Sequence, residues 1–343
     1  ADGAREPDEV IAPHGLIIAK AEITAGLVTA VSQYSIIENA RRVADGQTLD
    51  EHADAVASLW ARFNEVAQSN PAAWNRAPMT AADIRTSGPK NKPLAFPYNK
   101  WHNSQWNVDQ AACLVLCSVE AARAHGIPED RWVFPHAIVD SDHMVPVSER
   151  GEPHRSPGFR IAGQRAFELA GVRPDDIAHI DLYSCFPIAV RVQADELGIG
   201  TDRDLTITGG MTFAGGPLNN YVLQSTAAMM RRLREDAGAT GLVTAISGMI
   251  TKQGVSIWST RPAAGGYRSA EVQAEVEAAT PRRQPSADGP LEGTVAGYTV
   301  LYDDVTPSRT VAVVDADDGT RAVAVSTDAS LARTATTEEL GGR

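Results

Sequence analysis

A short stretch between an apolar strand and an apolar helix contains three side chains that could take part in a reaction. It reads DLYSCFPIAV (181–190) and places Tyr183, Ser184 and Cys185 side by side before a proline. A phenol with a pKa of about 10 can donate a hydrogen bond to a carbonyl or enolate oxygen. A thiol becomes a nucleophile only where its surroundings lower its pKa, and no residue in this stretch does so for Cys185. The stretch is therefore either a turn that lines a site, with Tyr183 as donor, or a polar strand end with Cys185 as a packed small residue.

Two further turns contain glycines where a strand is connected to the next element. They are TGGMTFAGGPLNN (208–220), which precedes a helix, and AISGMITKQG (245–254), which joins two strands. Such turns let the backbone approach a ligand, and a helix N-terminus favours an anion, although a tight turn that needs positive φ has the same composition. Ligands of open α/β sheets bind outside the carboxyl ends of the strands, so we expect all three turns to meet at one site.

Single histidine and lysine side chains are weaker candidates. His102 lies in NKWHNSQWN, a polar and aromatic cluster that could line a pocket, but a structural role is commoner for an isolated histidine. Lys252 could contact a phosphate or simply be solvated. The eight histidines show no metal-binding spacing. Cys113 and Cys117 are spaced C-x3-C without a second ligand pair, so we predict no metal site and place both thiols in a core element.

Composition limits the classes of function. The 343 residues suffice for two or three domains, and 43 acidic against 31 basic side chains give a net charge of -12. This charge argues against nucleic acid as a partner, although a local basic patch could still hold an anionic cofactor. Three cysteines are typical of a reduced, intracellular protein, and we predict a cytoplasmic one. No apolar run reaches the roughly 18 residues that span a bilayer, and no signal peptide is visible.

Elements that position these residues can be read from the apolar periodicity. Residues 49–71 form the clearest helix, and residues 107–128 suggest an apolar strand followed by a helix. Residues 72–107 are irregular and rich in aromatic side chains, which is typical of a surface region packed over something. From residue 156 onward, helices alternate with apolar strands, which predicts an α/β layer with a mostly parallel sheet. The first of these helices has a Ser-Pro start at Ser156 and Gly171 as its C-cap.

The last eighty residues change in character. Small, charged and helix-breaking residues at 263–289 are typical of a linker. Alternating apolar and polar residues then surround the turn pair Asp318-Gly319, which is a β-hairpin signature. We therefore predict a small, separate β-rich module at the C-terminal end.

Taken in order, the motifs resemble those of the thiolase superfamily, and in particular proteins of the acetyl-CoA acetyltransferase type. AFELAGVRPDDIAHIDLYSCFPIAV resembles the thiolase segment that holds the NEAF or HDCF motif, and GGMTFAGGPLNN resembles the segment that ends in Gly-His-Pro. GLVTAISGMITKQGVSIW resembles the Cys-x-Gly segment with the final hairpin, and NVDQAACLVLCSVEAARAHGI resembles the last strand and helix of the first half. The resemblance covers roughly residues 15–262.

The chain departs from thiolases at the positions that carry the family's chemistry. Tyr183 replaces the Asn or His of the first motif, Gly216 replaces the His of Gly-His-Pro, and Ile246 or Ser247 stands where Cys-x-Gly has its cysteine. Glycine cannot activate a nucleophile and isoleucine cannot move a proton. The family's nucleophilic cysteine belongs to a part of the fold that would precede residue 1. The resemblance thus implies reduced or lost thiolase catalysis.

The resemblance predicts an α/β fold of the thiolase-like layered αβαβα type with mixed sheets, plus the C-terminal β-rich module. Its parts are the remainder of the N-terminal half with the loop domain (1–150), the C-terminal half (151–262), the linker (263–289) and the extension (290–343). It implies CoA or an acyl-CoA of lipid metabolism as ligand or substrate, no covalently bound cofactor, and a possible homodimer or a partner contact through the β module. Candidate catalytic residues are Tyr183, Cys185 and Ser247, and candidate ligand-binding residues are Gly215, Gly216, Gly248 and His102.

Three functions remain open. The first is an acyl-CoA-handling protein of the acetyl-CoA acetyltransferase family, with thiolase chemistry weakened. The second is a thiolase-like aldolase that cleaves a β-hydroxyacyl-CoA with Tyr183 handling a proton. The third is a carrier of CoA or acyl-CoA without catalysis.

Overall fold

The computed structural model describes residues 15–286 and 292–343. The start of the predicted first part (1–14) and the junction of the predicted linker and module (287–291) lie outside the described residues. The α-helices are α1 Lys20–Ala25, α2 Ala30–Ala44, α3 Leu49–Ser69, α4 Ala81–Arg85, α5 Val119–Ala124, α6 Pro157–Ala170, α7 Pro187–Leu197, α8 Gly210–Phe213, α9 Tyr221–Glu235, α10 Gln273–Ala279 and α11 Ala329–Thr334. The strands are β1 Pro93–Ala95, β2 Tyr98–Asn99, β3 Phe134–Asp140, β4 His179–Asp181, β5 Thr240–Ser247, β6 Thr251–Ser259, β7 Arg268–Glu271, β8 Gly293–Asp303, β9 Thr306–Ala316 and β10 Arg321–Ser326.

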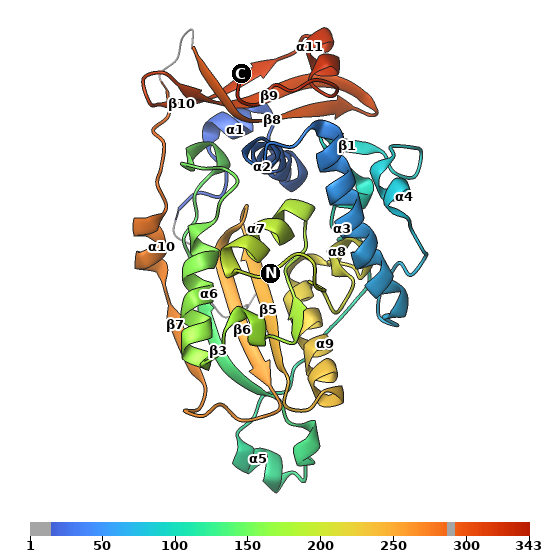
Figure 1. Cartoon of the computed structure of the whole chain (residues 1–343), viewed down its shortest axis with the longest axis vertical. Coiled ribbons are helices and arrows are strands. Elements are labelled where there is room, and N and C mark those ends of the chain that lie inside the picture. Colours follow the sequence, from blue (N-terminus) through green and yellow to red (C-terminus); the bar gives the residue numbers. More distant parts are fainter. Residues whose placement is uncertain (1–14, 287–291) are drawn as a thin grey trace, which may run out of the picture.

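One five-stranded sheet has the order β4-β5-β6-β3-β7 (Figure 1). Strand β4 is parallel to β5 and β7 is parallel to β3, whereas β5, β6 and β3 pair antiparallel. The sheet is therefore mixed rather than mostly parallel. The reason is the short turn between β5 and β6, because a tight connection can join only antiparallel strands.

The two faces of this sheet carry different helices. Side chains alternate along a strand, and Leu242 belongs to the main core cluster while its neighbour Val243 packs with Met229 and Leu233 of α9. Helix α6 contacts β6 and β3 on the face of the main cluster. It begins after Ser156 and ends at Gly171, which has a φ of 67°, as the sequence predicts. Helix α3 also confirms its prediction, since its apolar stripe from Val56 to Ala67 is buried.

The second sheet has the order β10-β9-β8-β1-β2, so the C-terminal strands are not a separate module. Ala95 of β1 pairs with Leu301 of β8, and α2 packs against β8 so closely that a side chain at Gly297 would meet the Ile36 carbonyl oxygen at 2.9 Å. The predicted hairpin is confirmed, because β9 and β10 pair antiparallel around Asp318-Gly319. Sequence periodicity could not reveal that β8, which lies beside this hairpin in the sheet, pairs with β1 about two hundred residues earlier in the chain.

Two segments differ from the sequence-based expectation. Residues 107–118 form no strand, and Cys113 and Cys117 are exposed rather than packed in a core. Within the described residues, no strand lies alongside this segment to pair with it. The predicted linker also contains β7, which pairs with β3, and α10, whose Val276 is buried in the core.

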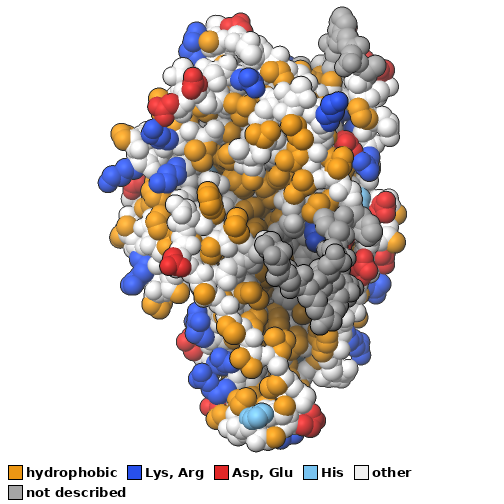
Figure 2. All heavy atoms as spheres, turned by 180° about the vertical axis from the view of Figure 1, so that it is seen from behind, with side chains coloured by type: hydrophobic (Ala, Val, Ile, Leu, Met, Phe, Trp, Pro, Cys, Tyr) orange, Lys and Arg blue, Asp and Glu red, His pale blue; other side chains and the backbone are white. Residues whose placement is uncertain are grey.

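The face opposite the view of Figure 1 gathers hydrophobic side chains across its middle (Figure 2). The apolar segment 107–118 contributes to the exposed apolar surface of the molecule, with Val115 and Leu116 86% and 76% exposed. Among the described residues, no helix is long and apolar enough to cross a membrane.

Candidate functional site

A buried carboxylate fixes the first and second turns to each other. Asp181 ends β4 with no exposed surface, and its Oδ2 accepts hydrogen bonds from the Ile207 and Thr208 N–H groups at 3.0 and 3.1 Å. Its Oδ1 accepts from the Tyr221 hydroxyl at 2.9 Å. Burial raises the pKa of Asp181, and these hydrogen bonds oppose that rise. This anchoring role was not predicted from the sequence, where its only sign is an acidic residue inside an otherwise apolar strand.

Tyr183 is held firmly beside this anchor. Its N–H donates to Thr244 Oγ1 at 2.8 Å, and its half-buried ring meets the Tyr221 ring edge-on at 5.7 Å. Burial raises the pKa of the Tyr183 hydroxyl, with a further contribution from Cys185. The phenol therefore stays protonated at neutral pH and can donate a hydrogen bond, but it is a poor base.

The two neighbours of Tyr183 in the motif serve different purposes. Ser184 Oγ accepts a hydrogen bond from the Met211 N–H at 3.0 Å, so this hydroxyl ties the first turn to α8. Cys185 is 8% exposed, and burial raises the pKa of its thiol to about 12, with the Tyr34 hydroxyl opposing part of that rise. A thiol with this pKa is almost entirely protonated at pH 7 and is a weak nucleophile.

Tyr34 of α2 connects the first turn with the third. Its ring stacks on Phe186 with the centroids 4.5 Å apart, and its hydroxyl donates to the Gly248 carbonyl oxygen at 3.2 Å. The Ser247 side chain is exposed and takes no part in this contact. The Ser247 carbonyl oxygen accepts a hydrogen bond from Thr251 Oγ1 at 3.4 Å. The expected meeting of the turns thus depends on a tyrosine that sequence reasoning did not single out.

The second turn lies under an irregular segment, residues 104–110. The Gly216 N–H donates to the Gln105 carbonyl oxygen at 2.9 Å, and Gln110 Nε2 donates to the Ala214 carbonyl oxygen at 2.7 Å. The same segment reaches the first turn, where the Ser104 N–H donates to the Cys185 carbonyl oxygen at 3.1 Å. This is the covering role expected for the aromatic-rich region. The glycine loop itself contains the short helix α8.

Both glycines of the second turn are closely packed. A Cβ on Gly215, whose φ is 98°, would lie 2.3 Å from Gln110 Oε1, and one on Gly216 would lie 2.7 Å from Met211 Cε. A larger side chain at Gly216 would require Met211 to move. Lys252 is also occupied, since its Nζ lies 3.2 Å from Asp142 Oδ1.

His102 lines a cavity of about 320 Å³ together with residues of α3, β2 and β8 and of the turn between β1 and β2. Tyr183, Cys185 and Gly248 are not among the residues that line this cavity. The structure therefore brings Tyr183, Cys185, Gly216 and Gly248 into one neighbourhood and places His102 in another.

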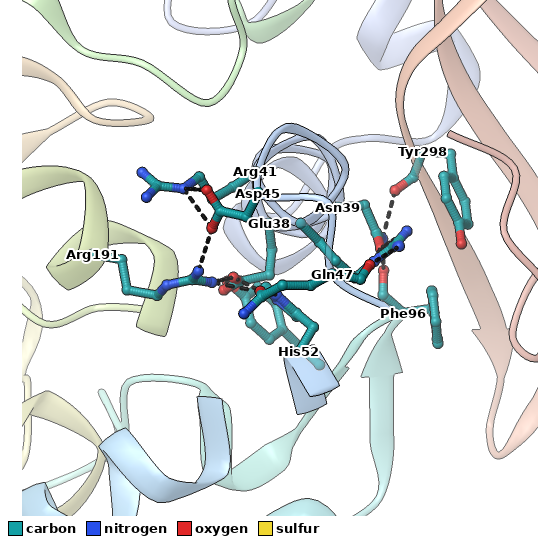
Figure 3. Close-up of polar contacts among 11 residues, drawn as sticks. Glu38, Asn39, Arg41, Asp45, Gln47, His52, Phe96, Arg191 and Tyr298 are labelled. Carbon is teal, nitrogen blue, oxygen red and sulfur yellow. Dashed lines mark hydrogen bonds and ion pairs between the residues drawn. The ribbon is translucent and has the colours of Figure 1, made fainter. Parts of the chain in front are cut away.

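A buried ion network supports the wall of this cavity (Figure 3). Glu38 Oε1 lies 2.8 Å from His52 Nε2 and 3.0 Å from Arg191 Nη1, and the Tyr98 hydroxyl donates to Glu38 Oε2 at 2.5 Å. Burial alone would raise the pKa of Glu38, but these three partners outweigh it and hold the pKa at about 2. Glu38 is therefore a permanent anion that orients the side chains around it.

The mixed α/β architecture with two five-stranded sheets matches that of a thiolase-like protein of known structure. No family model matches the chain. A solved structure of a monomeric SCP2-thiolase like protein type 1 from Mycobacterium smegmatis superposes with a TM-score of 0.84 and 31% identity, covering 95% of this chain and 72% of that one. The chain belongs to the SCP2-thiolase-like group of the thiolase superfamily.

Curated relatives are more distant and carry two different activities in their names. An acetyl-CoA acetyltransferase from Methanocaldococcus jannaschii is 23% identical over 61% of this chain and 55% of its own length. A steroid side-chain-cleaving aldolase from Thermomonospora curvata is 28% identical over 53% of this chain and 46% of its own length. The chain thus spans about half the length of these relatives.

Proposed function

We propose that the three turns form a binding site for an acyl-CoA thioester of lipid metabolism, in which thiolase catalysis by this chain's own residues is lost. The observation that carries this proposal is the enclosure of Cys185, which is only 8% exposed, so that burial raises the pKa of its thiol to about 12. Gly216 packed against Met211 and the buried apolar Ile246 support it, because neither can transfer a proton. The names of the acetyl-CoA acetyltransferase relatives support a CoA ester as the ligand.

Calorimetric titration with acetyl-CoA tests binding at this site. Ser247 is exposed beside Gly248, so Ser247→Trp should cover the third turn without disturbing the core and should weaken binding at least tenfold. Ser330→Trp on the exposed surface of α11 is the matched control and should bind as the unmodified chain does. Equal affinities for the two variants would contradict the proposed location.

A second candidate is cleavage of a β-hydroxyacyl-CoA, which the name of the Thermomonospora relative favours. In this reaction the Cα–Cβ bond breaks, the β-hydroxyl group becomes a carbonyl, and a proton is lost from that hydroxyl and gained at the α-carbon. The Tyr183 hydroxyl would donate a hydrogen bond to the thioester oxygen while negative charge develops on it. Its raised pKa suits it to this donor role rather than to removing the proton of the β-hydroxyl group.

Tyr183→Phe separates this candidate from the remaining functions. For an aldolase, the substitution abolishes turnover of a β-hydroxyacyl-CoA and leaves CoA binding intact. For a carrier without catalysis, CoA binding is tight, no acyl-CoA yields product, and the substitution changes neither property. A homodimer, or a partner held by the C-terminal sheet, remains part of the proposal for the carrier.

A further inference from the structure

His102 carries a buried hydrogen-bond donor that is not used within the protein. The Asn99 N–H donates to His102 Nδ1 at 3.0 Å, so Nδ1 acts as the acceptor. Burial lowers the pKa of this imidazole to about 4, and the ring is neutral at pH 7. A neutral imidazole that accepts at Nδ1 must hold its proton on Nε2. Among the described residues, that atom has no hydrogen-bond partner, although the side chain is only 5% exposed.

An unpaired buried donor is costly, and such a group needs a reason. His102 lines the cavity of about 320 Å³ described above. This volume lies at the lower end of the range of about 300–1,000 Å³ for small-molecule pockets. His102 therefore belongs to the wall of a cavity large enough to hold an organic molecule.

The walls of the cavity define the chemistry of its occupant. About half of the lining is apolar or aromatic and includes Leu49, Val56, Phe96, Tyr98 and Tyr302. These side chains favour an apolar body, because burying apolar surface away from water is favourable.

Charged groups on the wall are already neutralised by partners within the protein. Arg42 pairs with Glu339, and Arg85 lies 2.5 Å from Asp50 and 2.6 Å from Asp54. His52 is engaged by Glu38. A charged ligand would have to break one of these pairs, whereas a neutral ligand leaves them intact.

We propose that this cavity binds a neutral, mainly apolar molecule whose carbonyl oxygen accepts a hydrogen bond from His102 Nε2. Tyr183, Cys185 and Gly248 of the turns do not line this cavity, but the two regions adjoin. Tyr98 lines the cavity and stacks on Phe186 with centroids 5.4 Å apart, and Phe186 stacks in turn on Tyr34. The cavity and the turns thus share an aromatic stack but not a ligand.

The pair of probes α-tetralone and tetralin tests the proposal, because they share a bicyclic body and only the first has a carbonyl oxygen. Calorimetry on the unmodified chain at pH 7 should show both binding, with α-tetralone about fivefold tighter, as a net hydrogen bond provides. His102→Phe removes the donor and keeps an aromatic ring, so the fivefold preference should vanish while tetralin still binds. His125→Phe, which changes an exposed histidine outside the cavity, should keep the preference.

Filling the cavity provides a second test that does not depend on His102. Val56→Trp places a large side chain on the wall and should abolish binding of both probes. Equal affinity of the two probes for the unmodified chain, or no binding of either, would overturn the proposal. So would a preference for α-tetralone that survives in a folded His102→Phe variant.

Discussion

Two buried carboxylates, Glu38 and Asp181, organise the polar chemistry of this molecule. Both side chains are 0% exposed, and each is surrounded by donors from elements far apart in the sequence. Removing one partner of a buried charge leaves the other uncompensated, which costs about 3–5 kcal/mol. These residues therefore position the elements around the turns and the cavity rather than react themselves.

The burial of Cys185 predicts that an alkylating reagent will modify the other two cysteines first. Cys113 and Cys117 are exposed, whereas Cys185 is buried with a pKa of about 12. Iodoacetamide at pH 7.5 should alkylate the first two and leave Cys185 unmodified until the chain is denatured. Peptide mapping by mass spectrometry measures this directly, and rapid native labelling of Cys185 would show that its thiol is activated.

The state of Glu38 predicts a loss of stability in acid. The folded pKa of about 2 lies below the ordinary value of 4.5, so its contribution to stability is present above pH 4.5 and is lost as the pH falls towards 2. Glu38→Gln should lower the free energy of unfolding at pH 7 by about 3–5 kcal/mol and flatten the acid dependence. Urea unfolding from pH 7 to pH 3 provides the measurement.

A substitution at an exposed carboxylate is the control for Glu38, because it removes a charge that lies outside the buried ion network. Glu235 is 70% exposed and its carboxylate lies 3.7 Å from Arg232. Glu235→Gln should change the free energy of unfolding by less than about 0.5 kcal/mol and keep the acid dependence. Similar losses for both variants would contradict the role assigned to Glu38.

At the scale of elements, α3 supports the glycine turn through an unusually close contact. A Cβ on Gly209, whose φ is 97°, would lie 2.6 Å from the Ala67 Cα. Gly209→Ala therefore combines backbone strain with a clash against a helix backbone, and we expect a loss of about 2–4 kcal/mol in the free energy of unfolding.

Gly171 provides the control for this prediction, because its φ is 67° but a Cβ there would meet nothing within 4 Å. Gly171→Ala should cost only the backbone term of about 1–2 kcal/mol. Chemical denaturation of both variants measures the difference, and equal losses would show that the contact with α3 does not matter.

The sequence could predict the elements that carry local signals. The apolar period of α3, the Ser156 and Gly171 ends of α6 and the Asp318-Gly319 turn all depend on neighbours in the chain, and each is confirmed. The position of the turns at the carboxyl ends of strands also predicted that they meet, and Tyr34 contacts both Phe186 of the first turn and Gly248 of the third.

Contacts that depend on distant partners could not be predicted. Tyr34 reaches Gly248 across more than two hundred residues, and β8 pairs with β1 from the opposite end of the chain. The apolar run around Cys113 failed as a strand because a strand needs a partner for its backbone groups, which its own composition does not reveal. His102 was chosen for its polar and aromatic neighbours, and only the structure assigns it to a cavity of its own.

At the scale of the whole molecule, the C-terminal sheet shares the main core. Val311 and Val313 of β9 are 0% exposed and belong to the same cluster as the residues of α6 and β5. The two sheets should consequently unfold together.

Calorimetry tests this cooperativity. Val313→Ala should remove about 1–3 kcal/mol of stability and lower the temperature of a single transition for the whole chain. Val325→Ala on β10, where the side chain is 46% exposed, should leave that temperature nearly unchanged. A second, separate transition that alone shifts in Val313→Ala would mean that the C-terminal strands form an independent unit.

The central claim is that the turns of this chain bind a CoA thioester without forming a covalent acyl intermediate. Its most direct test is the intact mass of the chain after incubation with acetoacetyl-CoA, at a concentration where calorimetry shows binding. We expect binding and no acetyl increment, because the Cys185 thiol stays protonated. An acetyl increment that maps to Cys185 and disappears when CoA is added would contradict it.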